Sequence, residues 1–595
     1  MGSRISHKRF WSLNLTVALF FVIILYQLLQ LAVIRQNALL SMADRQHQLT
    51  VETPPLRGQI LDSQGRELAT NLKVPSIYAV PKIIRKQDRD SWAAKVSPLL
   101  GLSETFTKER LNREKSFVWL KRKVSPEAEM KIKKLETPAF GIVEEYRRYY
   151  PQGDLLSHVL GFTNIDSEGL EGLEMTLNRE LEGRPGRRQT KRDALGREIK
   201  AFEVKMIPAL DGHRVHLTVD QQLQYLTERA LEKAFKDWKA KGAWAILMEA
   251  KTGKILAMAN RPTFNGNQYE TSPADLRRNR ALTDMFEPGS IFKIVAAAAA
   301  LNEGKVTPES KIDCENGDYR YGSKVLHDVH PYGLLSFEDV ISKSSNIGTV
   351  KAAAKLAPEV FHAYIEAFGF GRLSGIDLPG EVPGYTRPPK EWSKTSPYNI
   401  PIGQEVLVTA LQMTNAMAII ANGGSLMRPY VVSKIEDQAG VTLRRQHPKI
   451  IRSGIIRPEI AAIIRRILVK AVHEGTGKKA KIPGISVGGK TGTAQKTLPG
   501  GGYSHSNFVS SFIGFAPAED PLLVMTVGVD DPKPLYYGGT VAAPVFKEVV
   551  EAALYTLGYV PPESMPVDAA LKKTVRNLQA NSPKLQPAEV LGKGL

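Results

Sequence analysis

The pattern of apolar residues divides the chain into regions of different character, and its longest charge-free stretch lies near the start. Residues 11–34 contain no charged side chain and are rich in Leu, Val, Ile and Phe. A stretch of this length suits a helix that spans the hydrocarbon core of a bilayer. Basic residues flank it on both sides: Arg4, Lys8 and Arg9 before it, then Arg35 and Arg45 after it. The small excess on the N-terminal side favours a cytoplasmic N-terminus and an extracytoplasmic remainder.

A cleaved signal peptide is the alternative interpretation of this segment. The apolar core of a signal peptide usually has about 7–15 residues and ends at small residues that form the cleavage site. The segment here is longer, and its best small-x-small sequence, Ser41-Met42-Ala43, lies beyond Arg35. We therefore favour an uncleaved, single-pass anchor.

Beyond the anchor, two regions with different patterns follow. Up to about residue 210, short strand-like runs mix with charged stretches that are expected to be helical, such as residues 108–122 and 127–134. No catalytic constellation occurs there, which indicates an α+β pedestal. Longer apolar runs continue to about residue 558, and the polar, proline-containing tail after it is expected to be flexible. The expected organisation is a cytoplasmic tail (1–10), a transmembrane helix (11–34), a pedestal (35–210), a catalytic domain (211–558) and a flexible tail (559–595).

Two local patterns in the larger region predict particular elements. Residues 246–258 consist of two largely apolar runs around Lys251-Thr252-Gly253, which predicts a β-hairpin with this tripeptide at its tip. Further on, Pro288-Gly289 supplies a turn, and residues 294–300 strongly favour a helix.

Ser290 and Lys293 lie at this predicted turn and form the only S-x-x-K sequence of the chain. Residues three apart on a helix share a face, so the hydroxyl and the amine can meet. At a helix N-terminus, backbone N–H groups and the dipole also favour developing negative charge. Lys293 must be neutral to accept a proton, whereas an ordinary lysine titrates near ~10.4. Burial and a nearby, positively charged Lys490 would both lower its pKa.

S-x-x-K alone is weak support for catalysis, because a surface serine and lysine often match it. Two further motifs follow it in the chain: Ser344-Ser345-Asn346 and Lys490-Thr491-Gly492-Thr493. Earlier copies do not fit, since Ser12-Leu13-Asn14 lies in the apolar anchor and Lys251-Thr252-Gly253 precedes the serine. The order S-x-x-K, S-x-N, K-T-G is typical of the penicillin-binding protein and serine β-lactamase superfamily, which this chain resembles.

The resemblance covers about residues 57–550 and is strongest to the cell-division (septal) branch of the class B penicillin-binding proteins. Outside the three motifs it rests on Arg57-Gly58-Gln59-Ile60-Leu61-Asp62-Ser63-Gln64-Gly65, Arg148-Tyr149-Tyr150-Pro151, His158-Val159-Leu160-Gly161, Gly169-Leu170-Glu171-Gly172-Leu173-Glu174, Leu217-Thr218-Val219-Asp220 and Ile402-Gly403-Gln404-Glu405. It implies a multidomain fold with an N-terminal transmembrane helix and an α+β pedestal similar to a dimerisation domain. A penicillin-binding, serine β-lactamase-like α/β transpeptidase domain would follow, with an antiparallel sheet flanked by helices.

The resemblance also implies roles for the motif residues. Ser290 would attack the penultimate D-Ala carbonyl of a peptidoglycan stem peptide, with Lys293 as the base. Ser344 is expected to relay a proton toward the leaving group, and Asn346 to bind the substrate amide and orient the base. Glu287 is expected to support the nucleophile helix rather than act as a base.

The K-T-G segment would bind the substrate. Lys490, Thr491, Gly492 and Thr493 would hold the substrate carboxylate on an edge strand, and the N–H groups of Ser290 and Thr493 would form the oxyanion hole. An amine from a second stem peptide would then attack the acyl-enzyme and complete the crosslink.

Other functions compete with that of a septal transpeptidase. An elongation-type class B transpeptidase is the nearest, but that branch commonly has Ser-x-Asp where this chain has Ser344-Ser345-Asn346. A D,D-carboxypeptidase or β-lactamase would pass the acyl group to water, and a large pedestal on one anchor is unusual for such hydrolases. A β-lactam sensor would be expected to carry further transmembrane segments.

Composition limits the cofactors and partners to expect. Lys and Arg total 80 against 61 Asp and Glu, and this net charge of +19 fits a solvated surface as well as contact with anionic wall polymer or lipid. One cysteine, Cys314, allows no intrachain disulfide, and the 11 histidines show no metal-ligand spacing. We therefore expect no metal, no cofactor and no nucleic acid.

The expected partners follow from the resemblance. They are peptidoglycan stem peptides and their lipid-linked precursor, β-lactams, the membrane, a polytopic glycosyltransferase and other division proteins. The expected location is the inner (plasma) membrane, with the catalytic domain in the periplasm or its extracytoplasmic equivalent.

Overall fold

The computed structural model of the protein describes residues 7–36, 48–192, 198–199, 205–321, 324–498 and 500–560. They form two compact units, each assembled from separate stretches of the chain. The first unit contains Met1–Leu56, Val74–Glu145 and Gly183–Asp211, and the second contains Arg57–Lys73, Tyr146–Glu182 and Gly212–Leu595. Two stretches of the expected pedestal thus pack with the second unit, which a single boundary near residue 210 does not anticipate. Most of the predicted flexible tail, residues 561–595, lies outside the described residues.

The expected membrane segment forms helix α1 (His7–Leu29), which continues through Gln30–Ile34 as a short π-helical turn. Its apolar side chains are exposed along the whole helix. The helical stretch Lys8–Val33 is long and apolar enough to cross a membrane.

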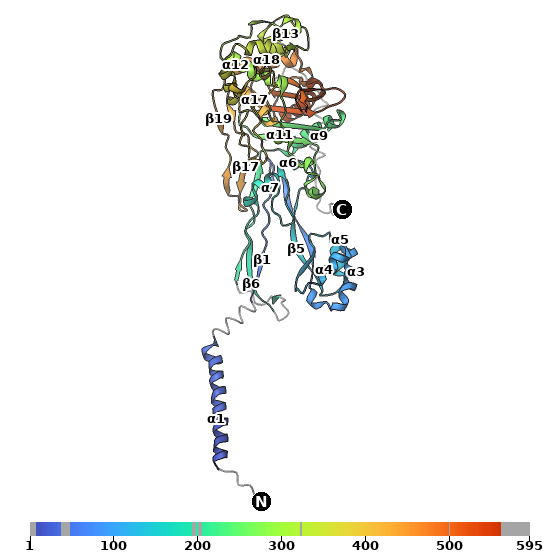
Figure 1. Cartoon of the computed structure of the whole chain (residues 1–595), viewed down its shortest axis with the longest axis vertical. Helices are drawn as coiled ribbons and strands as arrows, with labels where there is room; N and C mark the ends of the chain where they lie inside the picture. The colour runs from blue at the N-terminus through green and yellow to red at the C-terminus, as the bar shows by residue number, and fades with distance from the viewer. Residues whose placement is uncertain are drawn as a thin grey trace. The chain divides into compact units, whose positions relative to one another are not determined.

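The rest of the first unit contains a small sheet and a separate helical core. Its elements are β1 (Gln48–Thr53), η2 (Pro81–Ile83), η3 (Lys86–Asp88), α3 (Arg89–Leu100), α4 (Glu104–Leu111), β4 (Val118–Lys121), α5 (Pro126–Lys133), β6 (Gly186–Arg192), β7 (Glu198–Ile199) and β8 (Lys205–Ile207). Strands β1 and β6 run side by side and antiparallel (Figure 1). The three helices pack on β4 and on the end of β3 (Glu67–Ala79), where Ile77, Val96 and Leu111 are buried together.

The charged stretches predicted to be helical fold in two ways. Residues 127–134 largely coincide with α5, which begins at a serine cap, Ser125. The prediction for residues 108–122 is wrong beyond residue 111, because α4 ends there and β4 follows. Val118 and Trp119 favour a strand, which outweighs the surrounding charges.

The second unit is larger and contains most of the remaining elements. In chain order they are β2 (Ile60–Leu61), β5 (Phe140–Tyr149), α6 (Ser157–Leu160), α7 (Gly172–Thr176), α8 (Asn178–Leu181), β9 (Arg214–Leu217), α9 (Gln221–Asp237), β10 (Gly242–Glu249), β11 (Ile255–Arg261), η4 (Gly266–Thr271), α10 (Ala274–Arg277), α11 (Arg280–Thr283), η5 (Gly289–Phe292), α12 (Lys293–Asn302), β12 (Lys311–Asp313), η6 (Glu315–Gly317), β13 (Asp318–Tyr321), β14 (Lys324–His327), β15 (Leu334–Ser336), α13 (Phe337–Ser342), α14 (Asn346–Ala353), α15 (Pro358–Ala367), η7 (Pro389–Glu391), α16 (Ser396–Asn399), η8 (Ile400–Ile402), α17 (Ala410–Ala421), β16 (Leu426–Met427), β17 (Val432–Glu436), β18 (Thr442–Arg445), β19 (Ile450–Arg452), α18 (Pro458–His473), η9 (Lys478–Ala480), β20 (Gly488–Thr497), β21 (Tyr503–Ala516), β22 (Leu523–Asp530), α19 (Gly538–Val541) and α20 (Ala543–Thr556). Strands β3 and β5 contribute residues to both units.

A five-stranded antiparallel sheet of order β11-β10-β22-β21-β20 forms the centre of this unit. Helices α9 and α20 cover one face, where Leu231 and Phe546 join the sheet core, and α17 covers the other. Because both faces are covered, β10 and β11 are buried along nearly their whole length. The predicted antiparallel sheet flanked by helices is confirmed, and β20 is one of its edge strands.

The predicted hairpin is also confirmed. Strands β10 and β11 pair antiparallel, and Lys251-Thr252-Gly253 forms the connection between them. The Lys251 side chain is half-exposed and pairs with Asp520 at 2.6 Å.

A buried cluster of charges joins three separate segments of the second unit. Arg57 Nε and Arg148 Nε donate to opposite oxygens of Glu174, at 2.6 and 2.5 Å. Arg148 also donates to the carbonyl oxygen of Gly58 at 2.8 Å. Burial alone would raise the pKa of the Glu174 carboxyl, but the two guanidinium groups hold that pKa below its ordinary value. The cluster links the Arg57, Arg148 and Glu174 segments that carry the family resemblance.

Candidate active site

The S-x-x-K residues lie where a 3₁₀ turn passes into a helix. Ser290 is part of η5, and Lys293 is the first residue of α12. Ser290 is half-buried, whereas the Lys293 side chain is completely buried. The predicted position at a helix start is therefore confirmed, with the serine one turn before the α-helix proper.

Two glycines allow this turn to pack closely on its neighbours. Gly289 has a φ of +56° and donates its N–H to the Gly403 carbonyl oxygen at 3.1 Å. A Cβ on Gly403 would lie 2.2 Å from the Gly289 carbonyl oxygen. Glu287 accepts the backbone N–H of Glu405 at 2.9 Å, so this carboxylate supports the turn that carries Ser290. This contact agrees with the supporting role that the sequence predicts for it.

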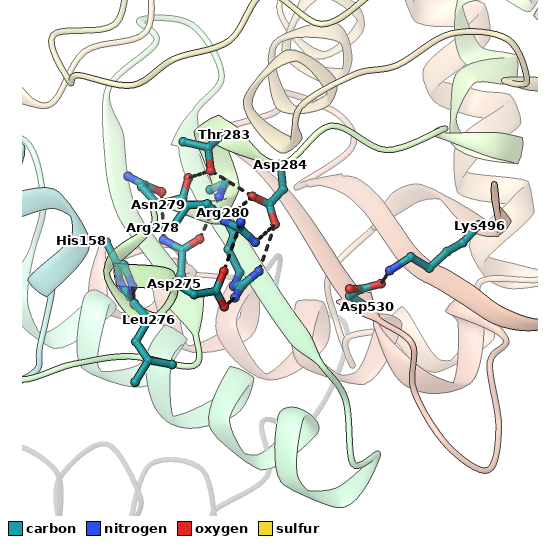
Figure 2. Close-up of polar contacts among 12 residues, drawn as sticks. His158, Asp275, Leu276, Arg278, Asn279, Arg280, Thr283, Asp284, Lys496 and Asp530 are labelled. Carbon is teal, nitrogen blue, oxygen red and sulfur yellow. Dashed lines mark hydrogen bonds and ion pairs between the residues drawn. The ribbon is translucent and has the colours of Figure 1, made fainter. Parts of the chain in front are cut away.

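Ion pairs tie together the segment that leads into the turn. Figure 2 shows Arg280 between the carboxylates of Asp275 and Asp284, at 2.8 and 3.1 Å, and Arg278 beside the same two residues. Thr283 donates to Asp284 at 2.9 Å. These contacts hold α10 and α11 to each other just before the turn that carries Ser290.

The S-x-N residues surround the Lys293 amine. Lys293 Nζ donates to the Ser344 carbonyl oxygen at 2.6 Å and to Asn346 Oδ1 at 2.7 Å, and it lies 3.3 Å from Ser344 Oγ. Lys490 Nζ donates to the same Ser344 hydroxyl oxygen at 2.7 Å. Ser344 has a φ of +63°, an unfavourable conformation for a residue with a side chain. The Ser344 hydroxyl thus lies between two buried amines.

The electrostatics of the two amines favour their neutral forms. Burial lowers the pKa of Lys293 to about 7, and the nearby Asp328 and Cys314 oppose this decrease. Burial also lowers the pKa of Lys490 well below its ordinary value, and the positive charge of Lys293 adds to this effect. The lowered pKa of Lys293 and its main cause, burial, agree with the prediction, and the repulsion between the two buried amines acts on both of them. A base with a pKa near neutrality suits proton transfer.

The K-T-G segment lies on the edge strand β20. Thr491 Oγ1 lies 2.6 Å from Thr476 Oγ1, and Thr493 Oγ1 accepts the N–H of Gly538 at 3.2 Å. A Cβ on Gly492 would lie 3.2 Å from the Pro288 carbonyl oxygen and closer still to other atoms. Glycine at this position therefore lets the strand approach the turn that carries Ser290, while the outer edge of the strand can pair with an extended peptide.

The structure brings together seven of the eight predicted site residues by contact or strand continuity: Lys293, Ser344, Asn346, Lys490, Thr491, Gly492 and Thr493. The Ser290 hydroxyl makes no hydrogen bond within the described part of the chain, so its pairing with Lys293 stays a prediction. The two rejected motif copies lie elsewhere, in α1 and at the β10–β11 hairpin.

Two polar residues at the site are absent from the sequence-based prediction. Asp328 contacts the S-x-N segment, and Thr476 contacts Thr491. Neither belongs to a motif, and both reach the site through tertiary packing. Residues that approach a motif only in the folded structure leave no local signal in the sequence.

An edge strand, a serine on a turn before a helix and a buried lysine one turn later form the arrangement that the three motifs predict for a penicillin-recognising serine enzyme. Residues 243–551 match the penicillin-binding protein transpeptidase domain, and residues 52–217 match the penicillin-binding protein dimerisation domain. The chain belongs to the class B penicillin-binding proteins, and it is a D,D-transpeptidase of the serine type.

Individual relatives are similar over most of their length. The chain is 36% identical to the stage V sporulation protein D of Bacillus subtilis, over 85% of this chain and 79% of that protein. It is 33% identical to the peptidoglycan D,D-transpeptidase FtsI of Escherichia coli, over 89% of each chain. Among solved structures, penicillin-binding protein 3 from Mycobacterium tuberculosis in complex with ampicillin matches with a TM-score of 0.68 and 28% identity, over 87% of this chain and 98% of that chain.

Proposed function

We propose that this chain crosslinks peptidoglycan during septal wall synthesis through a Ser290 acyl-enzyme. The observation that carries the mechanism is the pair of buried amines, Lys293 and Lys490, on either side of the Ser344 hydroxyl. A neutral Lys293 can take the Ser290 proton at physiological pH, because burial has already lowered its pKa to about 7.

The proposed acylation starts when Ser290 Oγ attacks the penultimate D-Ala carbonyl of a stem peptide. Its proton passes to Lys293, and the N–H groups of Ser290 and Thr493 stabilise the oxyanion. Ser344 then passes its proton to the departing amine and regains one from Lys293, so that terminal D-Ala leaves as a neutral amine and Lys293 is neutral again. Asn346 binds the substrate amide during these steps.

The substrate carboxylate would be held by Lys490, Thr491 and Thr493, with the peptide extended along β20 at Gly492. An amine of a second stem peptide then attacks the Ser290 ester, forms the crosslinking amide and returns the proton to the serine. We propose that β-lactams acylate the same hydroxyl, as the solved relative with bound ampicillin suggests.

The septal assignment rests on Ser344-Ser345-Asn346 and on the motifs shared with the division branch. Helix α1 would anchor the chain in the inner (plasma) membrane with a cytoplasmic N-terminus and an extracytoplasmic catalytic domain. A polytopic glycosyltransferase would supply the glycan strand, and other division proteins would direct the chain to the septum.

Intact-mass analysis after incubation with benzylpenicillin tests the nucleophile. We expect one stable adduct on the peptide that contains Ser290, and none in Ser290→Ala. An adduct in Ser290→Ala would show that another residue is acylated. A rapidly lost adduct in the wild type would instead indicate a hydrolase.

Depletion of the chain in its own organism tests the septal role. We expect filaments without septa, rescued by the full chain but not by Ser290→Ala. A form without residues 1–35, exported through a cleavable signal, should still bind penicillin and fail to restore septa. Swollen or round cells with normal septa would point to elongation instead.

A further inference from the structure

Asp328 directly follows β14 and contacts the S-x-N segment, although it belongs to none of the three motifs. Its Oδ2 accepts the Ser345 hydroxyl at 2.6 Å, and its Oδ1 accepts the backbone N–H of Ile347 at 3.1 Å. The same Oδ1 accepts the backbone N–H of Asn346. One carboxylate therefore binds three consecutive residues, starting immediately after Ser344.

These contacts complete the N-terminus of the helix that carries Asn346. Helix α14 begins at Asn346, and its first backbone N–H groups have no partner within the helix. Ser345 accepts the N–H of Gly348 at 2.9 Å, while Asp328 accepts those of Asn346 and Ile347. The serine cap and the carboxylate together fix the start of α14.

The neighbouring residue orients the Asn346 side chain. The His327 carbonyl oxygen accepts Asn346 Nδ2 at 2.8 Å, which directs Oδ1 of the same amide to Lys293 Nζ at 2.7 Å. Ser344, one residue before the anchored stretch, is held in its unfavourable conformation with a φ of +63°. Such a conformation persists only where the surrounding contacts enforce it.

We propose that Asp328 is a positioning residue of the acyl-transfer site: it holds Ser344 and Asn346 against Lys293, and its negative charge helps to set the protonation of that amine. The proposal rests on the proposed function of Lys293 as the base. Asp328 contacts none of the reacting groups directly. It acts by positioning the S-x-N segment and through the electrostatic effect of its negative charge.

The charge contribution can be separated from the contacts. The groups that face Lys293 from the surrounding elements are Asp328 after β14, Cys314 before η6 and Lys490 on β20. Burial lowers the pKa of Lys293 to about 7, and Asp328 is the larger of the two opposing influences. Removal of its charge should therefore lower the pKa of Lys293 further.

The experiment measures the acylation rate of the full chain by a fluorescent penicillin as a function of pH. Asp328→Asn keeps an oxygen of similar position but has no charge, so the acid limb of the profile should shift to lower pH. Asp328→Ala also loses the contacts, and its plateau rate should fall by about tenfold or more because the site residues lose alignment. The melting temperature of each variant reports whether it is folded.

Asp318→Asn is the matched control. Asp318 begins the other strand of the same hairpin, and its exposed carboxylate contacts the exposed His327 ring at 2.6 Å. We expect its acylation profile to equal that of the wild type. An equal shift in Asp318→Asn would mean that general surface charge, not Asp328, is responsible.

The outcomes distinguish this proposal from the proposed function. If Ser290→Ala still forms the adduct, the nucleophile assignment fails whatever the Asp328 variants do. If Ser290→Ala forms none and the Asp328→Asn profile superimposes on that of the wild type, the influence of its charge on the base is refuted. A wild-type plateau rate in a folded Asp328→Ala refutes the positioning role.

Discussion

Two clusters in the second unit contain completely buried ionisable side chains, but the partners of these side chains differ. Glu174 is fully buried but receives two guanidinium groups, from Arg57 and Arg148, within 2.6 Å. Lys293 and Lys490 are equally buried, yet no carboxylate in the described part of the chain forms an ion pair with either amine. Their hydrogen bonds go to neutral oxygens of Ser344, Asn346 and the backbone.

The difference distinguishes a structural charge cluster from the cluster that we propose to be reactive. Pairing lowers the pKa of Glu174 and keeps it ionised, so its charge serves to hold chain segments together. Burial without a paired carboxylate lowers the pKa of Lys293 and favours the neutral amine, which can accept a proton. Complete burial alone thus does not identify a catalytic group; the identity of its partners does.

Lys293→Ala should have the largest effect on the reactive cluster. We expect the acylation rate to fall by about 10²–10⁴-fold, the usual contribution of a positioned base, while the protein remains folded. In the wild type the rate should rise with pH through about 7, because the amine must lose its proton. Stopped-flow kinetics with a chromogenic β-lactam measure both effects.

Lys305→Ala provides the matched control, because Lys305 is an exposed lysine just beyond the end of α12. Its rate and pH profile should equal those of the wild type. A Lys293→Ala rate within about threefold of the wild type, when folding is intact, would exclude this amine as the base.

Glu174→Ala should destabilise the protein at the structural cluster without changing the acylation step. Removing one partner of a buried ion pair leaves charges uncompensated and costs about 3–5 kcal/mol. We expect a clear fall in melting temperature, with near-normal acylation of the molecules that remain folded. Glu168→Ala, an exposed carboxylate in the same region, should change the melting temperature little.

The two clusters should also respond to pH: the stability that each contributes rises with pH, but over different pH ranges. Glu174 has a lowered pKa, so its contribution to stability is present above the ordinary carboxyl pKa and is lost as the pH falls through the folded value. Lys293 has a lowered pKa of about 7, so the unfolded chain binds its proton more tightly, and stability from this group rises with pH above about 7. Melting curves of Glu174→Ala and Lys293→Ala across pH would show whether each trend disappears.

The sequence predicted the reactive cluster better than the structural one. The order of the three motifs located Lys293, Ser344 and Lys490, because each spacing is local and each residue type is chemically constrained. Asp328 could not be predicted, since it reaches the site through the hairpin β13–β14 rather than through a spacing. The pairing of Arg57 with Glu174 joins residues 117 positions apart, and only the tertiary fold sets this distance.

The same limit explains the interleaving of the two units. Residues 57–73 and 146–182 look like parts of one pedestal when the chain is read in order. Their packing with the rest of the second unit depends on long-range contacts such as those of Leu156 with Glu228 and of Tyr150 with Asn267. The helix prediction failed at residues 112–122 for a local reason instead, because the charged residues there obscured the strand-favouring Val118 and Trp119.

The two K-T-G copies test whether the surroundings of a lysine decide its role, because their sequences are identical and only their surroundings differ. Lys490→Ala removes a buried amine that donates to Ser344, and we expect acylation to slow by about 10²-fold, the typical loss for one preorganised donor. Lys251→Ala removes only a surface ion pair with Asp520, which contributes little, so acylation should stay within about twofold of the wild type. Comparable losses in both variants would mean that the surroundings of a K-T-G lysine do not decide its role. A normal rate in Lys490→Ala would remove this residue from the substrate site while leaving Lys293 as the base.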